Sequence, residues 1–232
     1  MTNRIRQIYD QLYDRYGPQG WWPLLCHSGT NTTKTGCIKG YHPKEYSFPR
    51  SADEIFEICC GAILTQNTSW VAVEKALLNL NRLDALSPRN LLDLDDQTFK
   101  EAIKPAGYFN QKAKKLRIFT SFFLVLNGRI PNRDELLGIW GIGPETADSI
   151  LLYAYKVPTF VVDAYTRRIF SALGIISEQA EYAAIKKKFE ENIPSDYIIY
   201  QEYHALIVEH AKRYYAKKGL YQECPLMKKY RI

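Results

Sequence analysis

The stretch 137–148 combines residue types that could bind a phosphate group. Gly141 and Gly143 stand on either side of a single apolar residue, and Pro144 follows immediately. Proline is favoured at the first position of a helix, so we expect a short helix, a tight turn and a second helix that begins at Pro144. Because glycines add no side chains to that turn, its backbone amides can face an anion.

Asp163 stands downstream, directly before a helical pattern at residues 164–173. An aspartate in that place is commonly an N-cap, whose carboxylate accepts the first N–H groups of the helix. An ionised carboxylate can also orient a water molecule or stabilise positive charge that develops on a substrate. The residues alone leave both roles of Asp163 open. They also leave open that the hairpin only connects two helices and binds nothing. A dinucleotide-binding fingerprint is excluded, because Thr146 replaces the third glycine and no strand precedes the turn.

These two stretches resemble the helix-hairpin-helix DNA glycosylase superfamily, which includes endonuclease III. The separation of 18 residues from Glu145 to Asp163 (163 − 145) matches that family. The resemblance implies a two-lobed, all-α fold, with a damaged base flipped out of double-stranded DNA into the cleft between the lobes, and Asp163 as the catalytic residue. It also implies that the hairpin contacts DNA through Gly141, Gly143, Glu145 and Thr146, with a monovalent cation bound by its carbonyls.

Two further segments extend the resemblance towards the N-terminus. Residues 62–68 look like the family segment whose glutamine enters the gap left by the flipped nucleotide, which assigns Gln66 and Asn67 to DNA binding. The alternative for Gln66 is a polar residue that only satisfies the end of a helix. Residues 107–113 match a turn and a helix start of the same family, and we expect Lys112 in this segment to contact DNA.

Glu145 predicts the type of reaction. Bifunctional members of the family place a lysine at this position of the second hairpin helix, where its amine attacks the sugar and forms a Schiff base. A carboxylate cannot form that adduct. We therefore expect a monofunctional glycosylase without lyase activity, which uses water as the nucleophile and leaves an abasic site.

Two consecutive tryptophans and a proline, Trp21, Trp22 and Pro23, stand just after a predicted helix. Aromatic faces suit an extruded base, particularly one made cationic by alkylation. Packing in the core or in a lid is the alternative. Together with the features above, this motif is similar to the 3-methyladenine DNA glycosylase III branch of the superfamily. That similarity implies release of alkylated purines such as 3-methyladenine, and it places Lys217 in the base pocket.

The cysteines argue against an iron–sulfur cluster. Many members of the superfamily end with four cysteines spaced C-x6-C-x2-C-x5-C that hold one. With Cys224 as the third, the other positions fall on Tyr214, Tyr221 and Tyr230. One thiolate cannot hold a four-iron cluster, so we expect no cluster, and no cofactor or metal besides the monovalent cation at the hairpin. A mismatch thymine or adenine glycosylase is the alternative within the superfamily, although such members usually keep the cysteines. If the protein is not an enzyme, the alternative is a non-catalytic helix-hairpin-helix DNA-binding protein.

The elements that must position these residues are predicted to be helices. Hydrophobic residues recur at three- and four-residue spacing, alternating strand patterns are almost absent, and 46% of the 232 residues are hydrophobic, which favours a packed all-α protein. We assign 52–160 to a helical lobe that contains the hairpin, and 1–51 with 161–232 to a second lobe. The polar insertion 26–47 departs from the family pattern. Whether it binds a metal stays open for four of its residues: Cys26, His27, Cys37 and His42.

Charge and hydropathy fit an intracellular partner of DNA. The chain has 31 Lys and Arg against 25 Asp and Glu, a net charge of +6, which permits a polyanionic partner without proving one. No apolar run approaches the ~20 residues that cross a bilayer, and the N-terminus shows no signal-peptide pattern. We expect a cytoplasmic, nucleoid-associated monomer without a membrane partner, which removes alkylated purines from double-stranded DNA in base excision repair.

Overall fold

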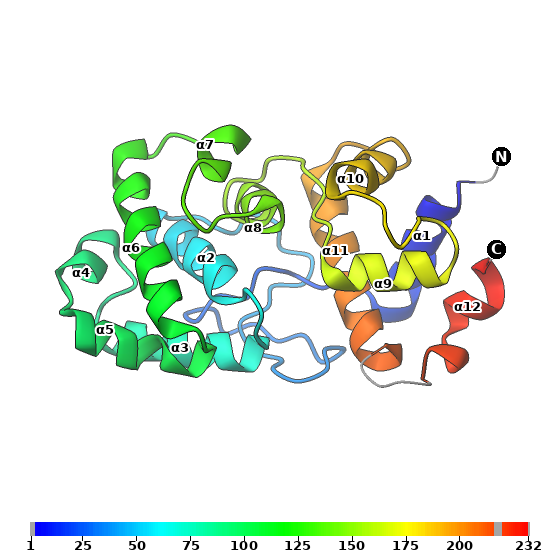
Figure 1. Ribbon diagram of the computed structural model, residues 1–232. Helices are drawn as coiled ribbons and strands as arrows, with labels where there is room; N and C mark the ends of the chain where they lie inside the picture. The colour runs from blue at the N-terminus through cyan, green and yellow to red at the C-terminus, as the bar shows by residue number, and fades with distance from the viewer. Residues whose placement is uncertain (1–2, 216–219, 232) are drawn as a thin grey trace. The chain divides into compact units, whose positions relative to one another are not determined.

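The computed structural model describes residues 3–215 and 220–231, and helices are its regular elements there (Figure 1). An isolated bridge between Thr30 and Lys39 is the sole extended pairing in these two ranges. The predicted all-α fold class is confirmed. In chain order the helices are α1 (Arg4–Tyr16), α2 (Ala52–Leu64), α3 (Trp70–Arg82), α4 (Pro88–Asp93), α5 (Asp96–Ile103), η1 (Lys104–Ala106), α6 (Phe109–Leu126), α7 (Arg133–Leu137), α8 (Pro144–Ser149), η2 (Ile150–Ala154), α9 (Ala164–Ala172), α10 (Tyr182–Glu190), α11 (Tyr197–Tyr214), η3 (Leu220–Glu223) and α12 (Pro225–Tyr230).

The chain divides into two compact units. The first unit comprises Met1–Trp21, Gly29–Tyr46 and Val157–Ile232, and the second comprises Trp22–Ser28 and Ser47–Lys156. Beyond the lobe assigned to 52–160, the second unit therefore takes in residues 22–28 and 47–51, which include both ends of the insertion. Their contacts give the reason, because the backbone N–H of Leu25, for example, donates to Glu57 on α2 at 2.7 Å.

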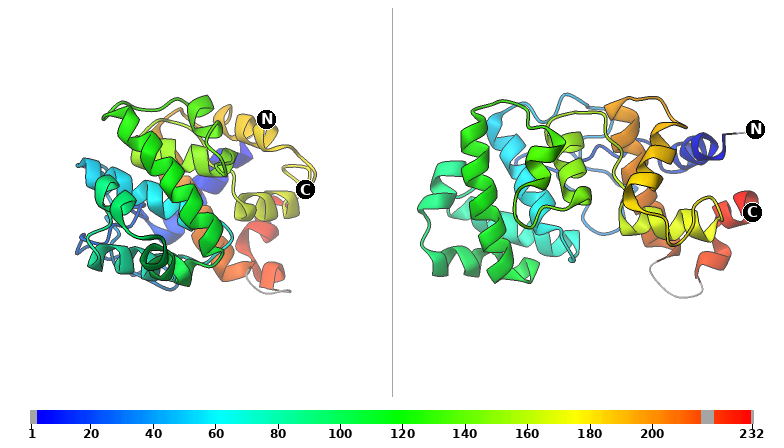
Figure 2. Two further views of the ribbon diagram at one scale, coloured as in Figure 1. Left: turned by 60° about the vertical axis from the view of Figure 1, so that its left-hand side comes forward. Right: turned by 45° about the horizontal axis from the view of Figure 1, so that its top comes forward.

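Helix α2 forms the centre of the second unit. Ser51 caps its N-terminus by accepting a hydrogen bond from the backbone N–H of Glu54, and from Phe56 to Leu64 every residue of α2 is buried. Because this stretch is buried on every side, other helices must cover it, and α3, α6, α8 and η2 all contact α2 (Figures 1 and 2). This packing places the C-terminal end of α2 beside α8.

Helix α11 forms the centre of the first unit, where it packs against α1 and α9 (Figure 2). An aromatic cluster fixes the chain just before α9. Phe160 stacks on Phe189 with ring centroids 4.3 Å apart and meets Tyr203 of α11 edge-on at 5.8 Å. Because buried aromatic rings contribute large apolar areas, this cluster anchors the start of α9 against α11.

Residues 29–46 of the insertion are held by polar contacts within the first unit. Asn31 donates from its side chain to the Gln19 carbonyl at 3.1 Å, and the backbone N–H of Thr35 donates to the Glu209 carboxylate at 3.1 Å. In the described part of the chain, no group of three or more His, Cys, Asp and Glu residues could hold a metal ion. None of the helices in that part is long and apolar enough to span a membrane.

Candidate functional site

The predicted hairpin consists of α7, a turn and α8. A capping box formed by Asn132 and Glu135 starts α7, and Pro144 is the first residue of α8, as the sequence predicts. The Arg133 guanidinium donates two bonds to the Asp148 carboxylate, at 2.8 and 3.1 Å. A two-bond contact of this kind has a defined geometry, so it fixes α7 relative to α8 and holds the turn between them.

Gly141 occupies a place in the turn that needs a glycine. Its φ is +84°, in the region that side chains disfavour, and a Cβ there would lie 2.5–2.9 Å from the stem of Lys115. Gly143 differs, because its φ is −95° and a Cβ there would meet nothing within 4 Å. The first glycine therefore permits a close approach of α6, whereas the second leaves the start of α8 open.

Gln66 is bonded to the hairpin. Its amide nitrogen donates to the Gly141 carbonyl at 3.1 Å and to Thr146 Oγ1 at 3.0 Å, and its amide oxygen accepts from the Lys115 ammonium. The structure thus brings together three predicted DNA-binding residues: Gln66, Gly141 and Thr146. It adds Lys115, which the sequence analysis missed and for which the signal was the run of basic residues at the start of α6.

Lys112 lies inside the second unit. Its ammonium donates to the carbonyls of Leu64 and Ala106, each at 2.8 Å, and only 2% of the residue is exposed. Burial lowers the pKa of Lys112 to about 8. A contact with DNA would break both of these hydrogen bonds. In the structure the side chain instead satisfies the carbonyls at the ends of α2 and η1. The neighbouring Lys114 is exposed and carries its ammonium 4.4 Å from the ring of Trp140.

Asp163 is the N-cap of α9 and only 8% exposed. Its Oδ1 accepts two bonds from Thr166, one from the backbone N–H and one from the hydroxyl, each at 2.7 Å. Its Oδ2 lies 3.6 Å from Nε2 of His204 on α11. Burial alone would raise the pKa of this carboxyl, but the contacts with His204 and Thr166 outweigh burial and hold the pKa below its usual value. A buried, ionised carboxylate results.

The two consecutive tryptophans lie in different units. Trp21 is half-buried in the first unit and meets His204 edge-on, with ring centroids 5.6 Å apart at 87°. Trp22 is buried in the second unit, where it meets Trp70 and Tyr153 edge-on at 5.5 and 5.1 Å. Trp21 is therefore beside the residue that faces the candidate carboxylate, whereas Trp22 has the contacts of a core side chain.

Lys34 of the insertion supports Trp21. The Lys34 side chain is fully buried, and its ammonium lies 3.4 Å from Glu209 Oε2 and 3.4 Å from Gln19 Oε1. It also lies 4.8 and 5.5 Å from the ring centroids of Trp21 and Tyr41, within the range of cation–π attraction. Burial lowers the pKa of Lys34 to about 8, although Glu209 opposes the shift. The polar composition of the insertion gave no sign of this buried charge.

The remaining predicted site residues differ in exposure. Gly143, Glu145 and Asn67 are exposed, and Asn67 follows the end of α2 with φ of +55°. Asparagine tolerates that left-handed conformation better than most residues. Pro23 is buried in the second unit. Lys217 lies outside the described residues.

The side chains around Cys224 do not form a four-cysteine cluster site. Cys224 is buried, its Sγ lies 3.1 Å from His210 Nε2, and it accepts a hydrogen bond from the Tyr215 hydroxyl at 3.4 Å. Tyr214 stands at one of the other three ligand positions, and its hydroxyl accepts a bond from Arg15 at 2.7 Å. Phenol oxygens replace the thiolates that such a cluster needs, so the residues present do not fit it.

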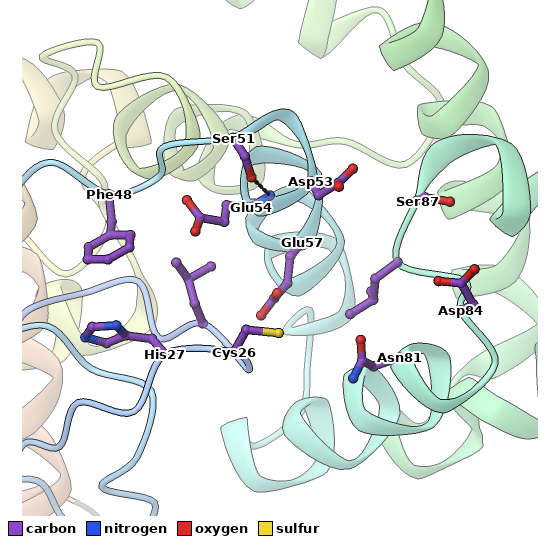
Figure 3. Close-up of a pocket in the computed structure, with 12 residues that line it drawn as sticks. Cys26, His27, Phe48, Ser51, Asp53, Glu54, Glu57, Asn81, Asp84 and Ser87 are labelled. Carbon is purple, nitrogen blue, oxygen red and sulfur yellow. Dashed lines mark hydrogen bonds between the residues drawn. The ribbon is translucent and has the colours of Figure 1, made fainter.

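A cavity of about 360 Å³ lies in the second unit (Figure 3). None of the predicted catalytic, base-binding or DNA-binding residues lines it, but Cys26 and His27 of the insertion do. Carboxylates from two segments line it, and the rings of His27 and Phe48 meet at its side with centroids 4.8 Å apart. Glu57 is the most buried of the carboxylates, and burial raises its pKa to about 7. The cavity-lining carboxylates are Asp53, Glu54, Glu57 and Asp84. This cavity would repel a phosphate.

Known proteins resemble the chain over most of its length. Residues 60–195 match the model of the HhH-GPD superfamily base excision DNA repair protein. A Methanocaldococcus jannaschii protein named as a putative DNA repair glycosylase is 44% identical over 233 residues, which cover 96% of this chain and 93% of that protein.

Solved structures show the same likeness. The crystal structure of the Helicobacter pylori 3-methyladenine DNA glycosylase MagIII, bound to 1,N6-ethenoadenine, is 29% identical with a TM-score of 0.61, over 72% of this chain and 91% of that one. A trapped covalent intermediate of endonuclease III with DNA reaches a TM-score of 0.74 at 20% identity, over 97% and 94% of the two chains. At that identity the second likeness concerns the fold alone.

Gly141→Ala is expected to lower the free energy of unfolding by about 1–2 kcal/mol, because the added Cβ is strained at positive φ and displaces the Lys115 stem. Gly143→Ala is the matched control, and we expect it to change stability by less than about 0.5 kcal/mol. Urea denaturation of both variants measures the difference. Equal stability of the two variants would contradict the role assigned to Gly141.

Glu57 is expected to make stability depend on pH. Because the folded-state pKa is raised, its stabilising contribution is complete below the unfolded pKa near 4.5 and is lost as pH rises through about 7. Glu57→Gln should therefore exceed wild type by about 3 kcal/mol at pH 8 and match it near pH 4.5. Urea denaturation at both pH values tests this, with substitution of the exposed Glu101 on α5, Glu101→Gln, as the control. A constant difference at both pH values would refute the assignment.

Proposed function

Because the chain belongs to the HhH-GPD superfamily of base excision DNA repair proteins, we propose that it is a monofunctional DNA glycosylase that releases alkylated purines of the 3-methyladenine type. In this proposal water bonds to C1′ of the deoxyribose and the N-glycosidic bond breaks. Its electron pair leaves with the base, and the proton of the water passes to solvent by way of Asp163. DNA keeps an abasic site and an intact backbone.

The environment of Asp163 is the observation that carries the proposal. Its carboxylate is buried yet ionised, because its contacts with Thr166 and His204 lower its pKa by more than burial raises it. One oxygen is committed to Thr166, which leaves the other for the reaction. A fixed negative charge in a site of low dielectric stabilises an oxocarbenium-like sugar far better than one in water. The N-cap role and the catalytic role are thus compatible in one side chain.

The exposed Glu145 supports hydrolysis rather than lyase chemistry. It lies in the first turn of α8, where a carboxylate favours the helix N-terminus. Bifunctional relatives carry their Schiff-base lysine at this position according to the family resemblance. A carboxylate there provides no amine that could attack the sugar.

Two observations support an alkylated purine as the substrate. The Helicobacter pylori protein that resembles this chain at 29% identity is a 3-methyladenine DNA glycosylase. Trp21 also places an aromatic ring next to His204, in contact with the partner of the candidate catalytic carboxylate. Alkylation of a purine ring nitrogen activates the base as a leaving group, so stacking and one carboxylate suffice for its release.

Asp163→Asn tests the catalytic role. Asparagine caps helices about as well as aspartate, so the variant should keep α9 while losing the negative charge. We expect base release from a duplex with one 3-methyladenine to slow by about 10²–10⁴-fold, measured under single-turnover conditions, with a thermal unfolding midpoint close to wild type. Full activity of a folded Asp163→Asn protein would overturn the mechanism. Release of thymine or adenine from mismatched duplexes, without release of alkylated purines, would favour a mismatch glycosylase.

Borohydride reduction tests the absence of a Schiff base. We expect wild-type protein to release the base, to yield no covalent complex with DNA on reduction and to cut no strand before alkali is added, because Glu145 cannot form the adduct. Denaturing gels of the labelled duplex with and without alkali separate the two steps. A reducible complex, or strand cleavage before alkali, would show the protein to be bifunctional.

A further inference from the structure

The two oxygens of Asp163 have different partners. Oδ1 accepts both available bonds from Thr166, so it is committed to the N-terminus of α9. Oδ2 faces Nε2 of His204 at 3.6 Å. A reaction at this carboxylate must therefore use Oδ2, and the imidazole is the group beside that oxygen.

Rigid packing determines where His204 lies. Only 5% of the residue is exposed, its helix α11 packs against α9, and Trp21 meets its ring edge-on. Tyr203, the preceding residue of α11, is buried in the aromatic cluster with Phe160, three residues before Asp163. The imidazole and the carboxylate are thus held by the same core, and His204 touches both Asp163 and Trp21.

We propose that His204 is a positioning residue for the reaction, which holds Oδ2 of Asp163 in place and keeps that carboxylate ionised while the base departs. The proposal rests on the proposed function, since it gives a partner to the carboxylate that the reaction uses. His204 touches no part of the substrate in this account and acts through Asp163. Through its edge contact it also links the carboxylate to the Trp21 ring.

The contacts of Asp163 determine in which direction its pKa should move when His204 is replaced. Burial raises the pKa of the carboxyl, and the contacts with His204 and Thr166 lower it by more. Thr166 on α9 is uncharged and Trp21 does not titrate. Among the described residues, His204 on α11 is the titratable side chain within ion-pair distance of Asp163. Without the imidazole, burial is opposed by Thr166 alone, so Asp163 takes up its proton at a higher pH.

His204→Leu and His204→Gln test the proposal in the intact protein. In single-turnover release of 3-methyladenine from a duplex, measured from pH 3 to pH 9, we expect the acidic limb of the His204→Leu rate profile to lie at a higher pH than the wild-type limb. On that limb the His204→Leu rate should be several-fold below the wild-type rate. Glutamine keeps an N–H donor, so His204→Gln should recover most of that loss. DNA affinity should stay within about twofold of wild type, because the effect falls on kcat.

His210→Gln is the matched control. His210 is also a buried histidine of α11, but it contacts Tyr16 and Cys224. Its substitution should leave the acidic limb in place whatever it does to stability. If His204→Leu lowers only the unfolding midpoint and keeps the wild-type limb, His204 is structural and the proposal is wrong.

A second measurement avoids any variant of His204. Imidazole nitrogen resonances of His204 should shift when Asp163→Asn removes the facing charge, and those of His210 should not. An unchanged His204 spectrum would overturn the pairing. The outcomes separate the two proposals. Full activity of Asp163→Asn refutes the proposed function, whereas an inactive Asp163→Asn with an unmoved limb in His204→Leu refutes the role of His204 alone.

Discussion

The charge on buried Asp163 is the constraint on which the candidate site depends. A carboxylate removed from water is stable only when contacts with polar groups of the protein replace its hydration. Thr166 supplies part of this from the same helix turn, and His204 supplies the rest from α11. The two helices must therefore pack in one register, which the aromatic contacts between Phe160 and Tyr203 enforce. Core packing and the chemistry of the site thus depend on the same helix pair.

The second unit also contains a buried charged group, the ammonium of Lys112, and stabilises it with uncharged carbonyl acceptors. Lys112 offers its ammonium to two carbonyls at the ends of α2 and η1, where the helices leave acceptors without intrahelical partners. Lys115, almost one turn further along α6, bonds to Gln66, which in turn bonds to the Gly141 carbonyl. One basic helix start therefore determines both the end of α2 and the position of the hairpin turn. Gln66, which the family resemblance assigns to the gap left by a flipped nucleotide, is therefore held in one orientation.

Local signals in the sequence predicted much of this arrangement. Pro144 after two glycines predicts the hairpin, and Asp163 before a helical pattern predicts its N-cap, because both depend on residues a few positions away. Lys112 shows the limit of that reasoning. A basic residue at a helix start indicates an exposed face, and only the tertiary fold reveals the carbonyls beneath it. His204 and Trp21 are far apart in sequence, and no periodicity connects them. Adjacent Trp21 and Trp22 even belong to different units.

The Lys34–Glu209 pair explains why residues 29–46 of the insertion belong to the first unit. A buried ion pair contributes little net stability, because desolvation of both charges offsets their attraction. The pair instead determines where the insertion lies against α11. Arg213 donates to Glu209 at 2.9 Å, and Lys34 contacts Gln19 and the Trp21 ring as well. Any displacement of the insertion would leave a buried charge with fewer partners. The cost of that displacement restricts the Trp21 ring to one position, so a loop without regular structure determines the geometry beside His204.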